Sequence, residues 1–336
     1  MLGLKLARPE QPINDDWRRV SVRPRQGTLL AYPFEIIRLA AYWDRISNAA
    51  DDFDTSELDW QFEAAERAGK RVILSVGAVK NFGYPEFYVP QHQPDGSLRE
   101  GSLVGPQTHG TLYSAARRFI SQVVTRYRGR TSLVAWQLEH EAVDPLGLEH
   151  SWRLGRDFVE GELAALREAD SSRPVMMNGF LPTTPLVRVS QWWRTRDQGD
   201  SLAVASELAD IVGIDYYPRH ALLRLGPTTL YADGSAARPP SALLDTLRAR
   251  GKRWMVAEGQ AEPWEATTVP PSPGGKAMFT CGPHHLIENY NAASRWSSPQ
   301  TPLYAYLLWG AEYWVLRAGL GDRQYLDAFE RLLQEA

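Results

Sequence analysis

The chain has only one cysteine, Cys281, among 336 residues. A single thiol excludes an internal disulfide framework and any metal site built from several cysteines. Lysine and arginine form no long run, and the formal net charge is −3, which argues against a surface for nucleic acid. No stretch approaches about 18 consecutive apolar residues, and the N-terminus has no signal-peptide pattern. These absences predict a soluble, cytoplasmic protein that binds neither nucleic acid nor membrane.

Aromatic residues, in contrast, are abundant. The chain has 12 tryptophans and 14 tyrosines, and aromatic residues make up 11% of it. Hydrophobic residues at 43% and charged residues at 23% are proportions typical of a soluble globular protein with a large core. Because cores use tryptophan sparingly, we expect some of these rings to line a cleft.

The order of apolar segments predicts alternating strands and helices. In the clearest repeat, a helix over 57–68 ends at Gly69, and a strand over 71–77 follows. Seven strands and one doubtful first strand within residues 1–33 alternate with helices without a linker, which predicts a single (β/α)8 TIM barrel over 1–336. The expected strands cover 34–43, 71–77, 133–138, 174–179, 210–218, 253–259 and 303–310. Long loops over 78–108 and 262–283 follow strand ends, where barrels hold their substrates.

One apolar strand ends in three ionisable groups. The segment S-L-V-A-W-Q-L-E-H-E-A, residues 132–142, places Glu139, His140 and Glu141 after a run of buried-strand character. Unpaired buried charge is costly, so the pattern indicates either a salt-bridged strand end or a strand that opens into a cleft. Glu139 is expected to be a structural partner of Arg38 or of a neighbouring polar group.

A second acid, Glu258, ends the apolar strand over 253–259. Barrel strands all open at their carboxyl ends on one face, so Glu141 on strand 4 and Glu258 on strand 7 are expected to face each other. Two such carboxyls, one protonated and one ionised, form the pair that a glycosidase needs. Arg38, on the strand over 34–43, is expected to point inward and to keep the nucleophile ionised. In the alternative interpretation, Glu258 is only a structural acid that pairs with Arg38.

Several segments resemble signatures of the clan A glycoside hydrolases. They are A-W-Q-L-E-H-E, D-Y-Y-P, V-A-E-G-Q-A-E-P-W and L-L-W-G-A-E-Y-W, which match strands 4, 6, 7 and 8. In addition, R-L-A-A-Y-W-D-R-I and F-D-T-S-E-L-D resemble the strand-2 region of cellulase-like members of the family 5 and family 42 type. The resemblance implies a retaining β-glycosidase that works by double displacement on a carbohydrate substrate, without a metal or organic cofactor.

The resemblance also implies roles for individual residues. Glu141 would be the acid/base and Glu258 the nucleophile. Arg38 and Tyr217 (or Tyr216) would hydrogen-bond the nucleophile, and Trp309 would form the platform under the sugar. Further candidates for contact with the substrate, by stacking or through hydroxyl groups, are Trp43, Lys80, Asn178 and Trp264.

The chain departs from the clan pattern at His140, where an asparagine usually precedes the acid/base and donates to the sugar 2-hydroxyl. Imidazole can also bond a hydroxyl group, so the departure bears on the identity of the sugar. It also leaves open a barrel that binds sugar without cleaving it. A third alternative is a metallohydrolase with Glu139, His140, Glu141, Glu149 and His150 as ligands. The sequence names neither the sugar and its linkage nor the oligomeric state.

Overall fold

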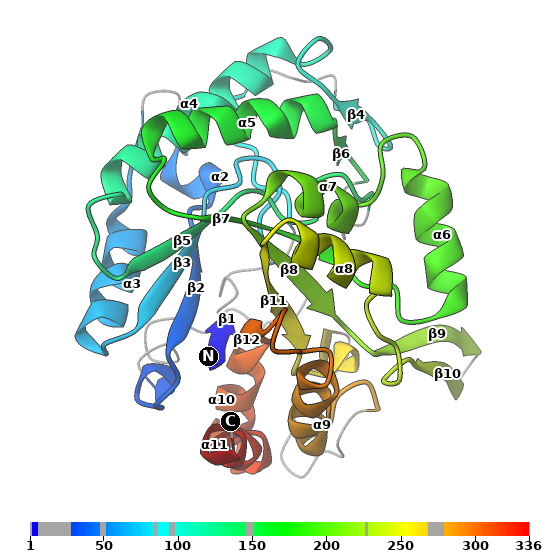
Figure 1. The fold of residues 1–336 in the computed structure, drawn as a ribbon. Coiled ribbons are helices and arrows are strands. Elements are labelled where there is room, and N and C mark those ends of the chain that lie inside the picture. The colour runs from blue at the N-terminus through cyan, green and yellow to red at the C-terminus, as the bar shows by residue number, and fades with distance from the viewer. Residues whose placement is uncertain are drawn as a thin grey trace. The chain divides into compact units, whose positions relative to one another are not determined.

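The computed structural model describes residues 2–5, 28–47, 52–83, 86–93, 98–145, 151–225, 228–267 and 279–335. Parallel strands form a closed barrel in the order β1-β12-β11-β8-β7-β5-β3-β2, with helices between them (Figure 1). The predicted (β/α)8 fold is therefore confirmed. The barrel strands are β1 (Leu2–Lys5), β2 (Ile36–Ala40), β3 (Arg71–Ser75), β5 (Leu133–Gln137), β7 (Val175–Phe180), β8 (Ile211–Tyr216), β11 (Arg253–Gln260) and β12 (Leu303–Trp309).

The doubtful first strand is real. Strand β1 pairs in parallel with β12, with Leu2 opposite Tyr306 and Lys5 opposite Trp309. The next part of the unassigned N-terminal region, residues 6–27, lies outside the described residues. Backbone contacts divide the chain into two compact units. The terminal unit comprises Met1–Ile37, Leu181–Arg188 and Ile214–Ala336, and the central unit comprises Arg38–Phe180 and Val189–Gly213. That residues 1–336 act as one catalytic domain stays a prediction.

The helices are amphipathic and bury one face each. Helix α4 buries Leu112, Ala116, Phe119 and Val123, which recur at the three- and four-residue spacing of a helical stripe. Gly69 follows α3 with φ +67°, as expected for a residue that ends a helix in the left-handed conformation. The helices are α2 (Trp43–Ile46), α3 (Ser56–Arg67), α4 (Gly110–Tyr127), α5 (Arg156–Ala169), α6 (Pro185–Thr195), α7 (Ser201–Leu208), α8 (Ser241–Ala249), α9 (Pro283–Ser294), α10 (Ala311–Gly319) and α11 (Gln324–Glu335). None of the described helices is both long and apolar enough to cross a lipid bilayer.

Two small sheets lie outside the barrel. A hairpin of β9 (Arg219–Leu225) and β10 (Thr228–Asp233) follows β8 directly. Short strands β4 (Leu103–Val104) and β6 (Arg153–Leu154) pair in parallel. The sequence pattern predicts a helix over 151–169, but because of this pairing α5 begins only at Arg156. Both sheets belong to the connections that follow strand ends.

Helix α6 has an unusual distribution of polar and apolar residues. It buries Gln191 and Thr195, while Trp192 and Trp193 are 62% and 60% exposed. The guanidinium of Arg196 lies 3.9 Å from the centre of the Trp193 ring, a cation–π contact at the surface. The outward face of α6 is therefore its apolar face.

Candidate active site

Glu141 follows strand β5 in a strained turn. The backbone of Glu139 has φ +53° and that of Glu141 has φ +44°, a region that residues with a side chain rarely adopt. Each such residue costs about 1–3 kcal/mol, so it persists only where its surroundings hold it firmly. Glu139 is fully buried, and Glu141 is 7% exposed. The turn that presents Glu141 is thus a constrained one.

Buried hydrogen bonds from the segment after β3 hold this turn. The carboxylate of Glu139 accepts hydrogen bonds from the backbone N–H of Val79 at 3.0 Å and of Lys80 at 2.5 Å. The Lys80 ammonium in turn donates to the carbonyl oxygens of Glu141 at 2.7 Å and Asp144 at 3.0 Å. Glu139 therefore has the structural role predicted for it, with a neighbouring polar segment as partner. Lys80, a predicted substrate contact, is fully buried and directs its ammonium at the backbone.

A chain of side-chain amides orients His140. Gln137 donates to the Asn178 carbonyl oxygen at 3.0 Å, which leaves the Asn178 amide nitrogen to donate to His140 Nδ1 at 2.8 Å. Nδ1 is therefore an acceptor, and the proton of the neutral imidazole resides on Nε2. Gln137 also donates to the carbonyl of Glu139 at 2.9 Å, which links this chain to the strained turn.

Glu258 lies in strand β11 and is 3% exposed. The hydroxyl of Tyr217 donates to Glu258 Oε2 at 2.5 Å, a short charge-assisted hydrogen bond. Tyr216 points elsewhere, because its hydroxyl donates to the carbonyl of Ser235 at 3.2 Å and its ring packs edge-on against Trp296. Of the two tyrosines that the sequence offered, Tyr217 is thus the one that reaches the acid.

An aromatic group continues from Tyr217. The Trp264 ring lies 5.3 Å from that of Tyr217 and 5.0 Å from that of His220. His220 shares a 3.0 Å hydrogen bond with the Thr183 hydroxyl, and burial lowers the pKa of His220 to about 4, so the imidazole is neutral at pH 7. Trp264 is thereby held against Tyr217, the residue that donates to Glu258.

Trp309, the last residue of β12, is followed by a glycine that the fold requires. Gly310 has φ +93°, and a Cβ added there would overlap the side chain of Glu262, which is buried. The short connection after β12 thus brings Glu262 against the backbone next to the predicted sugar platform.

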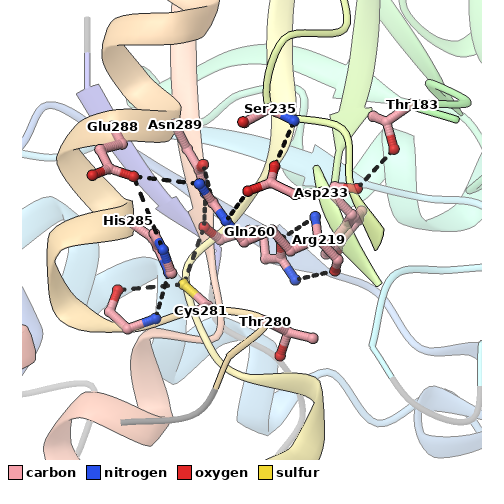
Figure 2. Close-up of polar contacts among 12 residues, drawn as sticks. Thr183, Arg219, Asp233, Ser235, Gln260, Thr280, Cys281, His285, Glu288 and Asn289 are labelled. Carbon is pink, nitrogen blue, oxygen red and sulfur yellow. Dashed lines mark hydrogen bonds and ion pairs between the residues drawn. The ribbon is translucent and has the colours of Figure 1, made fainter. Parts of the chain in front are cut away.

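A buried network lies two residues beyond both Tyr217 and Glu258 (Figure 2). The Gln260 amide accepts from the Arg219 backbone N–H at 3.2 Å and donates to the Arg219 carbonyl at 3.0 Å. The Arg219 guanidinium donates to Asn289 at 2.9 Å and forms ion pairs of 3.3 Å with Asp233 and Glu288. This network ties β9 and β11 together beside the Tyr217–Glu258 bond. Neither Arg219 nor Gln260 is predicted as a site residue from the sequence, although each follows a predicted site residue by two positions.

Two further predicted site residues lie in the central unit. The guanidinium of Arg38, on β2, is fully buried and lies 4.1 Å from the centre of the Phe82 ring. Trp43 is 2% exposed, and its ring stacks on Phe119 at 5.5 Å, which favours a packing role. The proposed bond between Arg38 and Glu258 stays a prediction.

Helix α9 carries a group of side chains of the types that bind metals. His284, His285 and Glu288 on α9 offer ligand atoms within 4.8 Å of one another. However, His285 Nδ1 accepts the backbone N–H of Gly282 at 2.7 Å, so its other nitrogen carries the ring proton and has no lone pair for a metal. Glu149 and His150, ligands in the metallohydrolase alternative, lie outside the described residues.

The barrel thus has one acid, Glu141, after its fourth strand and another, Glu258, near the end of its seventh. Solved structures similar to this chain include xylanase 10B from Thermotoga maritima, at 13% identity and a TM-score of 0.53 over 92% of this chain and 82% of that one. The intracellular xylanase TsXylA from Thermoanaerobacterium saccharolyticum is similar over 92% of this chain and 85% of its own, at 13% identity and a TM-score of 0.52. A GH10 xylanase from Thermobacillus composti gives 14% identity and a TM-score of 0.52, over 92% and 83% of the two chains.

These similarities are of fold, and they confirm the expected resemblance to barrel glycoside hydrolases at that level. No protein-family model matches the chain, and no curated protein sequence matches it.

Proposed function

We propose that the chain is a retaining glycoside hydrolase that cleaves a β-linked glycoside or oligosaccharide. The observation that carries this proposal is the 2.5 Å hydrogen bond from Tyr217 to Glu258 at the carboxyl end of the seventh barrel strand. A buried carboxylate that receives such a bond is held ionised and in a fixed orientation, as a nucleophile must be. Glu141, at the end of the fourth strand, supplies the second acid.

The proposed mechanism has two displacements. In the first, a Glu258 oxygen attacks the anomeric carbon while Glu141 protonates the leaving oxygen, which produces a covalent glycosyl-enzyme. In the second, Glu141 acts as a base toward water, which releases the sugar with its original configuration. Because barrel strands open on a single face at their carboxyl ends, we expect both acids to reach one substrate.

The residues around the two acids are assigned roles from their hydrogen bonds and ring contacts. His140 carries its proton on Nε2, so it is assigned as the donor to a sugar hydroxyl, in place of the usual asparagine. Trp264 and Trp309 are assigned as stacking surfaces for apolar sugar faces. Asn178 and Lys80, proposed at first as substrate contacts, are reassigned as supports for His140 and for the Glu141 turn. Arg38 is kept as the proposed partner of Glu258.

The experiment is hydrolysis of a panel of aryl β-glycosides: xyloside, glucoside, galactoside, mannoside and fucoside. Wild type is compared with Glu258→Gln and with Glu168→Gln, an exposed acid on α5 that serves as control. We expect wild type and the control to cleave one or more of these, and Glu258→Gln to lose nearly all turnover. Equal rates in wild type and Glu258→Gln would contradict the assignment.

Two further results separate the alternatives. A barrel that only binds sugar would be stabilised against thermal unfolding by saccharides without cleaving aryl glycosides or polysaccharides. A metallohydrolase would lose its activity on chelation and regain it with metal. The proposed glycosidase is expected to be insensitive to chelators.

A further inference from the structure

The strained turn before Glu141 rests on a second buried acid. Glu162 lies on α5 among Phe158, Val159, Ala165 and Leu166, which form the buried stripe of this helix, and it is fully buried. Both of its carboxyl oxygens are buried and accept no hydrogen bond from any donor in the described part of the chain. The polar group that it meets is the carboxyl of Glu139.

Two neighbouring carboxyls in an apolar interior cannot both be ionised, because their repulsion adds to the cost of burying charge. Glu139 accepts two backbone N–H groups, which favour its ionised form, whereas Glu162 has no such donor. Burial and the charge of Glu139 raise the pKa of Glu162 well above its usual range. The proton of the pair therefore resides on Glu162, whose O–H donates to Glu139.

A buried cation acts on this pair. The Lys80 ammonium interacts favourably with Glu139 and also with the buried carboxyl of Asp144. Lys80 uses its backbone N–H on Glu139 and its ammonium on the carbonyls of Glu141 and Asp144. Glu139 and Lys80 thus join α5 to the backbone atoms of Glu141 itself.

We propose that Glu162 is a positioning residue for Glu141: as a protonated acid it anchors Glu139, which through Lys80 holds the turn that presents Glu141. This inference rests on the proposed function, in which Glu141 is the acid/base. It assigns to a helix outside the barrel a part in orienting a catalytic group, and it explains why an acid occupies the middle of the buried stripe of α5.

The test compares Glu162→Gln, which keeps a donor for Glu139, with Glu162→Leu, which removes it. The readout is kcat/KM for two glycosides of the sugar that wild type cleaves, one with a dinitrophenyl and one with a methoxyphenyl leaving group. Only the methoxyphenyl group needs a proton from Glu141 as it departs. We expect Glu162→Leu to lose 10-fold or more on the methoxyphenyl glycoside and less than 3-fold on the dinitrophenyl one, and Glu162→Gln to stay within 3-fold of wild type on both.

Leu166→Ala, one turn along α5 and fully buried, is the matched control for general damage to this helix. This variant is expected to change kcat/KM for both substrates by the same factor. The proposal is overturned if Glu162→Leu changes kcat/KM for the two glycosides by the same factor or leaves both values unchanged. It is also overturned if Glu162→Gln loses as much activity as Glu162→Leu. A wild type that cleaves no glycoside overturns the proposed function instead. The carboxyl pair is then tested alone by the infrared difference spectrum at neutral pH of wild type minus Glu162→Gln, which must contain the band of one protonated carboxyl.

Discussion

The hydroxyl of Tyr217 donates a 2.5 Å hydrogen bond to the carboxylate of Glu258. The two residues lie at the carboxyl ends of the adjacent barrel strands β8 and β11. Neither group is exposed: Tyr217 is 7% accessible and Glu258 3%. In such a site a hydrogen bond to a charged group is stronger than in water, and its loss leaves the charge without a partner. The pair therefore sets the orientation of the proposed nucleophile.

Tyr217→Phe keeps the ring against Trp264 and removes only the hydroxyl. We expect kcat/KM to fall about 10- to 100-fold, the range for losing one hydrogen bond to a charged group. Tyr216→Phe is the control, since its hydroxyl bonds only the Ser235 carbonyl among the hydrogen bonds described above. Equal effects of the two substitutions would contradict the assignment of Tyr217.

Gln260→Ala removes both hydrogen bonds to the backbone of Arg219 and leaves a buried N–H and C=O unpaired. We expect the free energy of unfolding to fall by about 1–3 kcal/mol, measured by urea denaturation. Gln61→Ala on α3, which loses one 3.4 Å bond to Glu57, should change it by less than about 0.5 kcal/mol. An unchanged midpoint in Gln260→Ala would show that the Arg219–Gln260 network contributes nothing to stability.

Gly310→Ala combines backbone strain with a steric overlap. Gly251 provides the control for strain alone, because it has φ +61° but nothing within 4 Å of an added Cβ. Gly251→Ala should cost about 1–2 kcal/mol, the penalty for a left-handed residue with a side chain. Gly310→Ala should cost more and should also lower activity, because Glu262 must move beside Trp309. The double variant Gly310→Ala with Glu262→Ala should recover part of the stability, and failure to do so would contradict the overlap.

Asp144 makes stability depend on pH. Burial raises its pKa from 3.8 to about 6, so the folded protein binds this proton more tightly than the unfolded chain does. Its contribution to stability is therefore fully present below about pH 4 and is lost as pH rises through 6. Asp144→Asn has no such proton. Its free energy of unfolding relative to wild type should increase by about 2 kcal/mol between pH 4 and pH 7. A difference that is constant with pH would contradict a raised pKa for Asp144.

The fold was predictable because β/α periodicity is a local signal. The strand over 71–77 and its preceding helix and Gly69 appear as expected, and even the doubtful first strand pairs with β12. The hairpin of β9 and β10 was missed, because it interrupts the β/α alternation immediately after β8. Helix α5 begins at Arg156, later than predicted, because Arg153 and Leu154 pair with the distant strand β4.

The acids of the candidate site were predictable from their place at the ends of apolar strands, but their supports were not. Lys80 reaches the carbonyl of Glu141 across 61 positions of sequence, and no local pattern indicates such a contact. Glu162 left a readable signal, because it occupies a position in the buried stripe of α5 where an apolar residue is expected. The positive φ angles of Glu139 and Glu141 have no counterpart in the sequence, since glycine or asparagine would be the usual residue there.

The outward-facing rings of α6 have a spectroscopic consequence. Trp192 and Trp193 are more than half exposed, whereas Trp43, Trp136, Trp254 and Trp314 are among the most deeply buried side chains of the described residues. Among the tryptophans of the described residues, iodide in solution should therefore quench the fluorescence of Trp192 and Trp193 most strongly. A molecule that covers this face of α6 would therefore be detected because it protects the fluorescence of Trp192 and Trp193 from iodide.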